Sequence, residues 1–332
     1  MTIRLAVIGA GVMGADHART VATQVPGATL QVVCDADLAR AKDVAGATGA
    51  ASTSNDPLAV IADKSVDAVL IASPDQTHGA LTIAAIEAGK PVLCEKPLAP
   101  TSAECLAVID AEVRGGKRLV QVGFMRRFDP AYCDMKAVLD SGTIGKPLMF
   151  HNFHRNVSVP DWFTSAMAIT NSAPHEFDIA RFILDTDYRN ITVFQPASTN
   201  SAVAVRPVFM VMEMAGGPLV DVEINNNADY GYDVRGELVG DKGTVSLRAP
   251  LTSETSVAGN LATRYPEDWR PRFADAYRLQ LQAFVRSIGD GKPVGASAWD
   301  GYQASLIAEA GVLSLARGNK ITVTAIDKPS LY

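Results

Sequence analysis

Cysteine and histidine are scarce in this chain, and their distribution excludes several kinds of site. Only 4 cysteines and 5 histidines occur among 332 residues, without the C-x-x-C or Cys/His spacing of a zinc site. Cys34 and Cys94 end apolar runs, while Cys105 and Cys133 fall in segments of helical character. We therefore expect four reduced thiols, buried or half-buried, rather than disulfides or a metal site.

Excess positive charge and long hydrophobic runs are missing as well. The 30 Lys and Arg residues form no run and are outnumbered by 36 Asp and Glu, which argues against nucleic acid or an anionic membrane as partner. No apolar stretch reaches the roughly 18 residues that cross a bilayer. Gly9, Gly11 and Gly14 follow the first apolar run closely, so no signal peptide is expected. These absences predict a cytoplasmic protein.

What is present is an ordinary globular composition, with 48% hydrophobic residues and enough length for two domains. Short apolar runs alternate with segments of helical periodicity over residues 1–123. The runs are Ile3–Ile8, Thr29–Cys34, Val66–Ala72, Pro91–Cys94 and Arg118–Val122; the helical segments are Val12–Gln24, Leu38–Ala47, Thr77–Ala88 and Ser102–Arg114. Strands that are apolar on both faces and separated by helices predict a doubly wound α/β domain with a parallel sheet.

The pattern changes after Gly123. Strand candidates with turn signals between them follow one another about ten residues apart, which is typical of antiparallel pairing. These candidates are Ile191–Gln195, Val205–Met214, Leu219–Asn225, Asp233–Val239 and Gly243–Leu247, and the expected helices are Asp129–Asp140, Ala173–Leu184, Phe273–Ile288 and Gly301–Arg317. We therefore expect residues 124–332 to form an α+β domain with a large open, mostly antiparallel sheet.

A glycine-rich turn lies between the first strand and the first helix. Its sequence, Gly9-Ala10-Gly11-Val12-Met13-Gly14, fits the GxGxxG pattern of dinucleotide-binding turns. In such a turn the first glycine permits the sharp bend and the second lets a pyrophosphate approach the backbone at the helix N-terminus. The third allows the helix to pack close to the strand. The segment from Gly9 to Gly14 is thus the predicted phosphate site.

An acidic residue in the expected place strengthens this prediction. Asp35 directly follows the second apolar run, 21 residues after Gly14. A carboxylate there accepts hydrogen bonds from the ribose hydroxyls and repels a 2′-phosphate, and no arginine directly follows it, since Arg40 is five residues on. The expected cofactor is NAD rather than NADP.

Two further loops follow strands of the predicted parallel sheet, where ligands bind. Ser73 and Pro74 are expected to touch the cofactor, while His78 is either a first-turn helix residue or a cofactor contact. Glu95 and Lys96 follow the fourth apolar run. Lys96 either polarises a substrate oxygen or forms a solvated pair with Glu95.

Three of the five histidines, His151, His154 and His175, fall in the second domain. Pro174 and the preceding polar residues predict a helix start, which places His175 and Asp178 on one helical face. A neutral histidine is suited to accept a hydroxyl proton, although a buried or capping histidine is the alternative.

These segments together resemble the Gfo/Idh/MocA oxidoreductases and, within that family, the inositol dehydrogenases. The resemblance covers nearly the whole chain and rests on the GAGVMG turn, Asp35, the EKP tripeptide at 95–97, GFMRRF at 123–128, HNFHRN at 151–156 and HEFD at 175–178.

The resemblance implies an NAD-dependent oxidation of a secondary ring hydroxyl of a cyclitol or pyranose sugar. It assigns catalytic roles to Lys96 and His175. It also implies a homo-oligomer, a tetramer or a dimer, formed through the open sheet of the second domain. The residues expected to face the polyol are Lys96, Arg126, Arg127, His154, Asn156, Asn171, His175, Asp178 and Tyr232, with Tyr230 as the alternative to Tyr232.

The chain departs from the inositol dehydrogenase pattern at one position. Asn171 stands where those enzymes carry an aspartate, four residues before the histidine. An amide orients an imidazole but does not stabilise its charge. His175 then works without that charge, or Asp178 supplies it, or the substrate is not myo-inositol. An aldose or sugar-acid dehydrogenase or reductase, and an NAD-binding redox-sensing regulator, therefore stay open.

Overall fold

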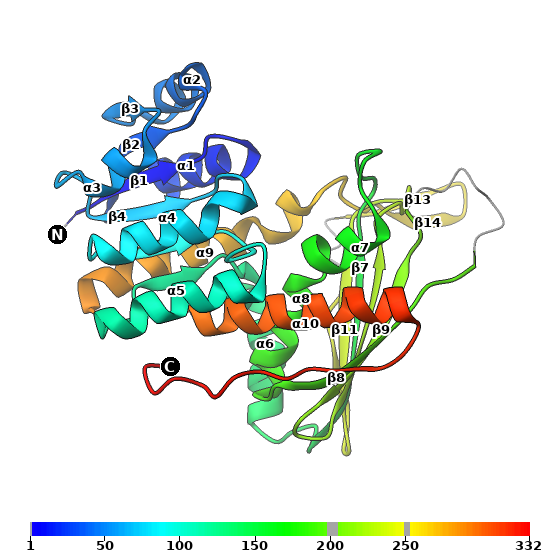
Figure 1. Cartoon of the computed structure of the whole chain (residues 1–332). Coiled ribbons are helices and arrows are strands. Elements are labelled where there is room, and N and C mark those ends of the chain that lie inside the picture. Colours follow the sequence, from blue (N-terminus) through cyan, green and yellow to red (C-terminus); the bar gives the residue numbers. More distant parts are fainter. Residues whose placement is uncertain (1, 198–204, 249–252) are drawn as a thin grey trace. The chain divides into compact units, whose positions relative to one another are not determined.

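The computed structural model describes residues 2–197, 205–248 and 253–332, which fold into two compact units (Figure 1). Unit 1 comprises residues 1–128, 275–305 and 326–332, and unit 2 comprises residues 129–274 and 306–325. Two long helices, α9 (Trp269–Asp290) and α10 (Ala298–Arg317), contribute residues to both units. Our division of the chain after Gly123 is based on sequence pattern and stays a prediction.

Unit 1 contains the predicted parallel sheet. Its six strands run in the order β3-β2-β1-β4-β5-β6, and every neighbouring pair is parallel. The strands are β1 (Ile3–Ile8), β2 (Ala28–Cys34), β3 (Ser52–Ser54), β4 (Ala68–Ile71), β5 (Val92–Cys94) and β6 (Val120–Val122). The helices are α1 (Val12–Gln24), α2 (Leu38–Thr48), α3 (Pro57–Ala62), α4 (Asp75–Glu87), α5 (Ser102–Gly115) and the 3-10 helix η1 (Met125–Phe128). The doubly wound α/β prediction is confirmed.

Both faces of this sheet are buried, as a parallel sheet requires. Leu5, Leu70 and Leu93 point to one face, where they form a core with α1 and with Leu281 and Phe284 of α9. Helices α4 and α5 lie side by side in unit 1 (Figure 1). Thus part of the core of unit 1 comes from the far C-terminal part of the chain.

Unit 2 is built on a seven-stranded sheet in the order β12-β11-β7-β10-β9-β8-β15, with one parallel pair, β7 and β10, among antiparallel neighbours. Its strands are β7 (Pro147–Arg155), β8 (Tyr188–Phe194), β9 (Val208–Met214), β10 (Leu219–Asn225), β11 (Asp233–Gly240), β12 (Thr244–Ser246) and β15 (Ile321–Thr322); β13 (Glu254–Val257) and β14 (Asn260–Thr263) form a separate hairpin. The helices are α6 (Pro130–Asp140), α7 (Ser165–Met167), the π-helical turn η2 (Ala168–Ser172) and α8 (Pro174–Leu184). The expected open, mostly antiparallel sheet is confirmed.

One expectation about the cysteines is wrong. Cys34, Cys94 and Cys105 are buried free thiols, but Cys133 is exposed. Its helix, α6, buries Tyr132 and Met135 instead, so Cys133 lies on the side of the helix that faces solvent. Helical periodicity alone did not reveal which side of α6 packs inward.

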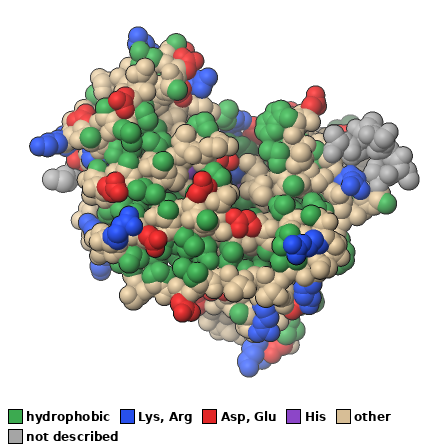
Figure 2. Space-filling view, in the orientation of Figure 1, with side chains coloured by type: hydrophobic (Ala, Val, Ile, Leu, Met, Phe, Trp, Pro, Cys, Tyr) green, Lys and Arg blue, Asp and Glu red, His purple; other side chains and the backbone are tan. Residues whose placement is uncertain are grey.

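Two observations on the described residues concern membranes and charged partners. No helix among the described residues is long and apolar enough to cross a membrane. On the face drawn in Figure 2, acidic and basic side chains of the described residues are interspersed rather than separated by sign.

The change in burial along one face of β7 generates a stability prediction. Phe150 is fully buried in the sheet of unit 2, whereas Leu148, on the same face but near the start of the strand, is 50% exposed. Because Phe150→Ala leaves a cavity in a packed core, it should lower the free energy of unfolding by about 3–5 kcal/mol. Leu148→Ala should change it by less than about 0.5 kcal/mol. Chemical denaturation of the two variants beside wild type measures both, and equal losses would contradict the difference in burial between these two positions.

Candidate functional site

The glycine-rich turn connects β1 to α1 and passes very close to β4. Gly9 has a φ of 97°, and a Cβ on it would collide with the carbonyl oxygen of Ala72, at the end of β4. A Cβ on Gly14 would collide with the carbonyl oxygen of Gly9. The first and third glycines are therefore required by the protein's own backbone, as the pattern predicts.

Gly11 differs from these two glycines. A Cβ built on it meets no atom of the described structure within 4 Å. Gly11 is also the N-cap of α1, and among the described residues no side chain caps this helix end. An uncapped helix N-terminus beside open space is a suitable site for an anion such as a pyrophosphate. The residues present thus fit a dinucleotide.

Asp35 follows β2 and is fixed beside this turn. Its carboxylate accepts hydrogen bonds from the backbone N–H of Ala10 at 2.7 Å and of Asp37 at 2.9 Å, while Arg40 lies 3.6 Å away. The link to Ala10 joins the acidic residue directly to the GxGxxG segment. The structure therefore brings together these two elements, which the sequence paired only by spacing.

Glu95 and Lys96 follow β5 at the same edge of the sheet. The Glu95 carboxylate is buried and lies 2.7 Å from Nε2 of His17 in α1. Its second oxygen accepts the Lys96 N–H at 3.2 Å. Burial alone would raise the pKa of Glu95, but the His17 contact and the charge of Lys96 outweigh burial and lower it. The peptide bond between Lys96 and Pro97 is cis.

The loop after β4 is organised by short contacts. The hydroxyls of Ser73 and Thr77 are 2.6 Å apart, and Thr77 also donates to the carbonyl of Pro74. His78 in α4 is buried, with its ring nitrogens 2.7 Å from the Pro97 carbonyl oxygen and 2.8 Å from that of Ser73. His78 thus behaves as a helix residue that contacts protein backbone.

Unit 2 gathers a second group of polar side chains. His154 lies on β7, and its Nδ1 is 3.0 Å from the Glu176 carboxylate of α8, with both residues buried. The ring of Tyr232 meets the His154 ring edge-on, 6.0 Å between centroids. His175 and Asp178 flank Glu176 on α8 and are also buried. Strand β7 and helix α8 therefore meet through His154 and Glu176, on the helix that also carries His175 and Asp178.

The remaining predicted residues lie on several different elements of the two units. Asn156, just after β7, donates to Asn226 at 2.6 Å, and Asn171 lies in η2 before α8. Arg126 and Arg127 lie on η1 in unit 1, where Arg127 forms a 3.0 Å ion pair with Asp300. Tyr230, the alternative to Tyr232, donates to Asp233 and accepts from Arg155.

Sequence reasoning missed Glu176 and His17 as members of these groups. Glu176 follows His175 directly, and a carboxylate that a helix buries needs a charged or hydrogen-bonding partner. His17 is one helical turn beyond Gly14, facing β5. No group of three or more His, Cys, Asp or Glu side chains with metal-binding geometry occurs among the described residues.

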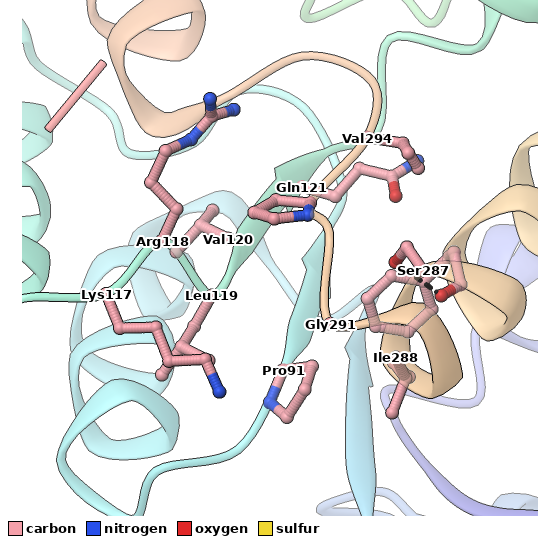
Figure 3. A pocket seen from close by; sticks show the side chains of 12 residues that line it. Pro91, Lys117, Arg118, Leu119, Val120, Gln121, Ser287, Ile288, Gly291 and Val294 are labelled. Carbon is pink, nitrogen blue, oxygen red and sulfur yellow. Dashed lines mark hydrogen bonds between the residues drawn. The ribbon is translucent and has the colours of Figure 1, made fainter.

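A separate surface pocket opens in unit 1 (Figure 3). Pro91 and Leu119, at the amino ends of β5 and β6, line it together with Ile288 and Gly291 at the end of α9. The glycine-rich turn, Asp35 and Glu95 all follow the carboxyl ends of their strands. The pocket is therefore not part of the predicted dinucleotide site.

Comparison with known proteins agrees with this geometry. A model described as an oxidoreductase family, NAD-binding Rossmann fold (Gfo/Idh/MocA), matches residues 3–124, and the model of its C-terminal alpha/beta domain matches residues 136–323. The chain is 49% identical to inositol 2-dehydrogenase 1 of Saccharopolyspora erythraea, covering 100% of this chain and 99% of that protein. It is 42% identical to an inositol 2-dehydrogenase of Klebsiella pneumoniae, with coverage of 100% and 99%.

A solved structure is similar over the whole chain as well. The crystal structure of myo-inositol dehydrogenase from Lactobacillus casei, in complex with NAD(H) and myo-inositol, superposes with a TM-score of 0.96 at 30% identity and 100% coverage of both chains.

The contrast between Gly11 and Gly14 can be tested. Gly11→Ala should fold with a loss of no more than about 1 kcal/mol, since its Cβ meets only open space. The same Cβ should weaken NAD binding by at least about tenfold, since it fills the space that a pyrophosphate needs. Gly14→Ala should destabilise the protein even without NAD. Denaturation and NAD titration of both variants measure this, and unchanged NAD affinity in Gly11→Ala would place the pyrophosphate elsewhere.

Proposed function

Because this chain belongs to the Gfo/Idh/MocA oxidoreductase family, we propose that it is an NAD-dependent dehydrogenase that oxidises a secondary ring hydroxyl of a cyclitol. The observation that carries this proposal is the full-length similarity to a structure holding both NAD(H) and myo-inositol. Two groups of polar side chains supply the residues for the proposed reaction. One surrounds Glu95 and Lys96 in unit 1, and the other surrounds His154 and His175 in unit 2.

The cofactor is NAD. Residues 3–124 match an NAD-binding Rossmann fold, and the Gly11 helix end and the fixed Asp35 carboxylate suit the pyrophosphate and a ribose without a 2′-phosphate. In our proposal Gly9, Gly11, Val12, Met13, Gly14, Asp35, Ser73, Pro74, Glu95 and Lys96 form the cofactor site. Bound nicotinamide supplies hydride acceptance.

Lys96 and His175 are the proposed catalytic residues. His175 accepts the proton of the reacting hydroxyl, and Lys96 holds and polarises the oxygen that becomes the carbonyl. Asp178, three residues after His175 on α8, is the proposed source of negative charge beside the imidazole.

The other polar residues are proposed to select the substrate by hydrogen bonding to its hydroxyls. These residues are Arg126, Arg127, His154, Asn156, Asn171 and Tyr232. The Glu176 contact fixes the ring of His154, so His154 presents its other nitrogen in a defined direction. A site built from such fixed partners discriminates between stereoisomers, because a misplaced hydroxyl leaves buried polar groups unpaired.

Asn171 favours a second substrate class, an aldose or a sugar acid, since the inositol dehydrogenase pattern has an aspartate there. Whether the enzyme works as a dehydrogenase or as a reductase is tested in the same experiment. A panel of inositol stereoisomers, aldoses and sugar acids, assayed with NAD for oxidation and with NADH for reduction, ranks these alternatives by kcat/KM.

The catalytic assignment predicts large losses of turnover. Lys96→Ala and His175→Ala should each lower kcat by at least about 100-fold on the best substrate, because each removes a group that acts in proton transfer or on the reacting oxygen. NADH formation at 340 nm measures kcat, and Lys64→Ala, at an exposed lysine, is the control.

Either variant retaining near wild-type turnover would remove that residue from the catalytic pair. Wild-type protein that binds NAD but turns over no member of the panel would contradict the enzyme proposal and favour an NAD-binding redox-sensing regulator.

We also propose that the chain forms a homo-oligomer, a tetramer or a dimer, through the open face of the unit 2 sheet. On this face Met149 pairs with Leu219 and Phe194 with Phe209 in register, and all four side chains are exposed. Paired exposed apolar side chains are costly in a monomer.

Phe209→Lys should therefore shift the mass in solution toward the monomer, because it would bury a charge in the interface. Leu58→Lys, at an exposed leucine of α3, should leave the mass unchanged. Light scattering after size exclusion measures both, and a monomeric wild type at working concentration would exclude the interface.

A cytoplasmic location is proposed on the evidence of the cysteines. All four are free, although one is exposed, and free thiols persist in a reducing compartment. Fractionation of the producing cells tests the location, and recovery from the medium or periplasm would contradict it.

A further inference from the structure

Two buried histidines of unit 1 have no part in the proposed reaction, yet both contact the segment that carries Lys96. His17 comes from α1 and His78 from α4, two helices far apart in the sequence. His17 contacts Glu95 and His78 contacts Pro97, the two residues on either side of Lys96. The contacts thus enclose one short segment from both ends.

The first contact fixes the residue before Lys96. The Glu95 carboxylate joins Nε2 of His17 at 2.7 Å and the N–H of Lys96 at 3.2 Å. The ring of Tyr277 packs against His17 at 5.6 Å, and a Cβ on Gly123 would lie 2.8 Å from the carboxylate. With no room to move, Glu95 holds the Lys96 backbone in one place.

The second contact fixes the residue after Lys96. Both nitrogens of His78 face carbonyl oxygens, those of Pro97 and Ser73. Carbonyls only accept, so both contacts are hydrogen bonds only when the ring carries two protons and a positive charge. Burial opposes that charge, but Cys94 and the two carbonyls outweigh burial and raise the pKa of His78 to about 10. The imidazolium therefore ties the Lys96–Pro97 segment to the loop after β4.

We propose that His17 and His78 are positioning residues that hold Lys96 in its reactive place, His17 through Glu95 and His78 through the Pro97 carbonyl. The inference rests on the proposed role of Lys96. Lysine has a long flexible side chain, so the precision of its ammonium depends on how firmly its backbone is held. A displacement of about 1 Å at a reacting group costs on the order of 100-fold in rate.

The test uses graded variants of each histidine. His17→Phe and His78→Phe keep a ring but remove the hydrogen bonds, whereas His17→Gln and His78→Gln keep one amide donor. Thr82→Val is the matched control, because Thr82 is buried one turn after His78 on α4. Its Oγ1 forms no hydrogen bond among the described residues.

The Phe variants should lower kcat about 10- to 100-fold and the Gln variants less. In a Lys96→Ala background the same substitutions should change kcat by less than about twofold, because the residue that they position is gone. Full, additive losses in that background would show a general structural role and overturn the proposal.

A readout independent of turnover keeps the inference separate from the proposed function. The rate at which an amine-reactive reagent labels Lys96, followed by mass spectrometry, should change at least about threefold in the Phe variants and not in Thr82→Val. Lys64 serves as the internal reference. Unchanged Lys96 labelling would overturn the proposal even if the wild type proved to have no dehydrogenase activity.

The charge on His78 has its own signature in pH dependence. A pKa raised from 6.5 to about 10 in the folded state adds stability that is complete below pH 6.5 and is lost as the pH rises toward 10. The stability difference between wild type and His78→Gln should therefore shrink across that range. A difference independent of pH would contradict the charged ring and, with it, the His78 half of the proposal.

Discussion

The close approach of backbone to backbone at the glycine-rich turn is the constraint on which the cofactor half of this protein depends. Gly9 passes so near the end of β4, and Gly14 so near Gly9, that a methyl group fits at neither position. This contact sets where α1 begins, and hence where its N-terminus points. Asp35, joined to Ala10, is held in the same frame. The proposed phosphate site is therefore set by main-chain geometry, and the Asp35 carboxylate of the proposed ribose site is held by main-chain N–H groups.

Much of the fold follows from the sequence because its signals are local. Strands such as Ile3–Ile8 are apolar on both faces, and helix α1 has the bounds that periodicity predicts. The exceptions have physical reasons. Strand β3 is three polar residues long and α3 is six residues, too short for a periodic signal. The single parallel pair of the unit 2 sheet, β7 with β10, is set by tertiary packing, which strand spacing does not encode.

In the candidate site, too, some features follow from local sequence and others only from the folded chain. Spacing alone links Gly14 to Asp35, because both belong to one βαβ unit. By contrast, His154 and Glu176 lie on different elements, and only the folded chain brings β7 against α8. The same is true of His17 and Glu95, 78 residues apart. The resemblance to a family supplied roles for Lys96 and His175 that residue patterns left open, and those roles stay predictions.

The interleaving of the two units has a consequence for synthesis. Leu281, Phe284 and Val285 of α9 pack on the same face of the parallel sheet as Leu5 and Leu70. A ribosome makes all six strands of that sheet, and then nearly the whole of unit 2, before it reaches α9. During that interval the nascent parallel sheet lacks part of its cover, an apolar surface of the kind that chaperones bind. The first domain to be translated is thus not the first that can be completed.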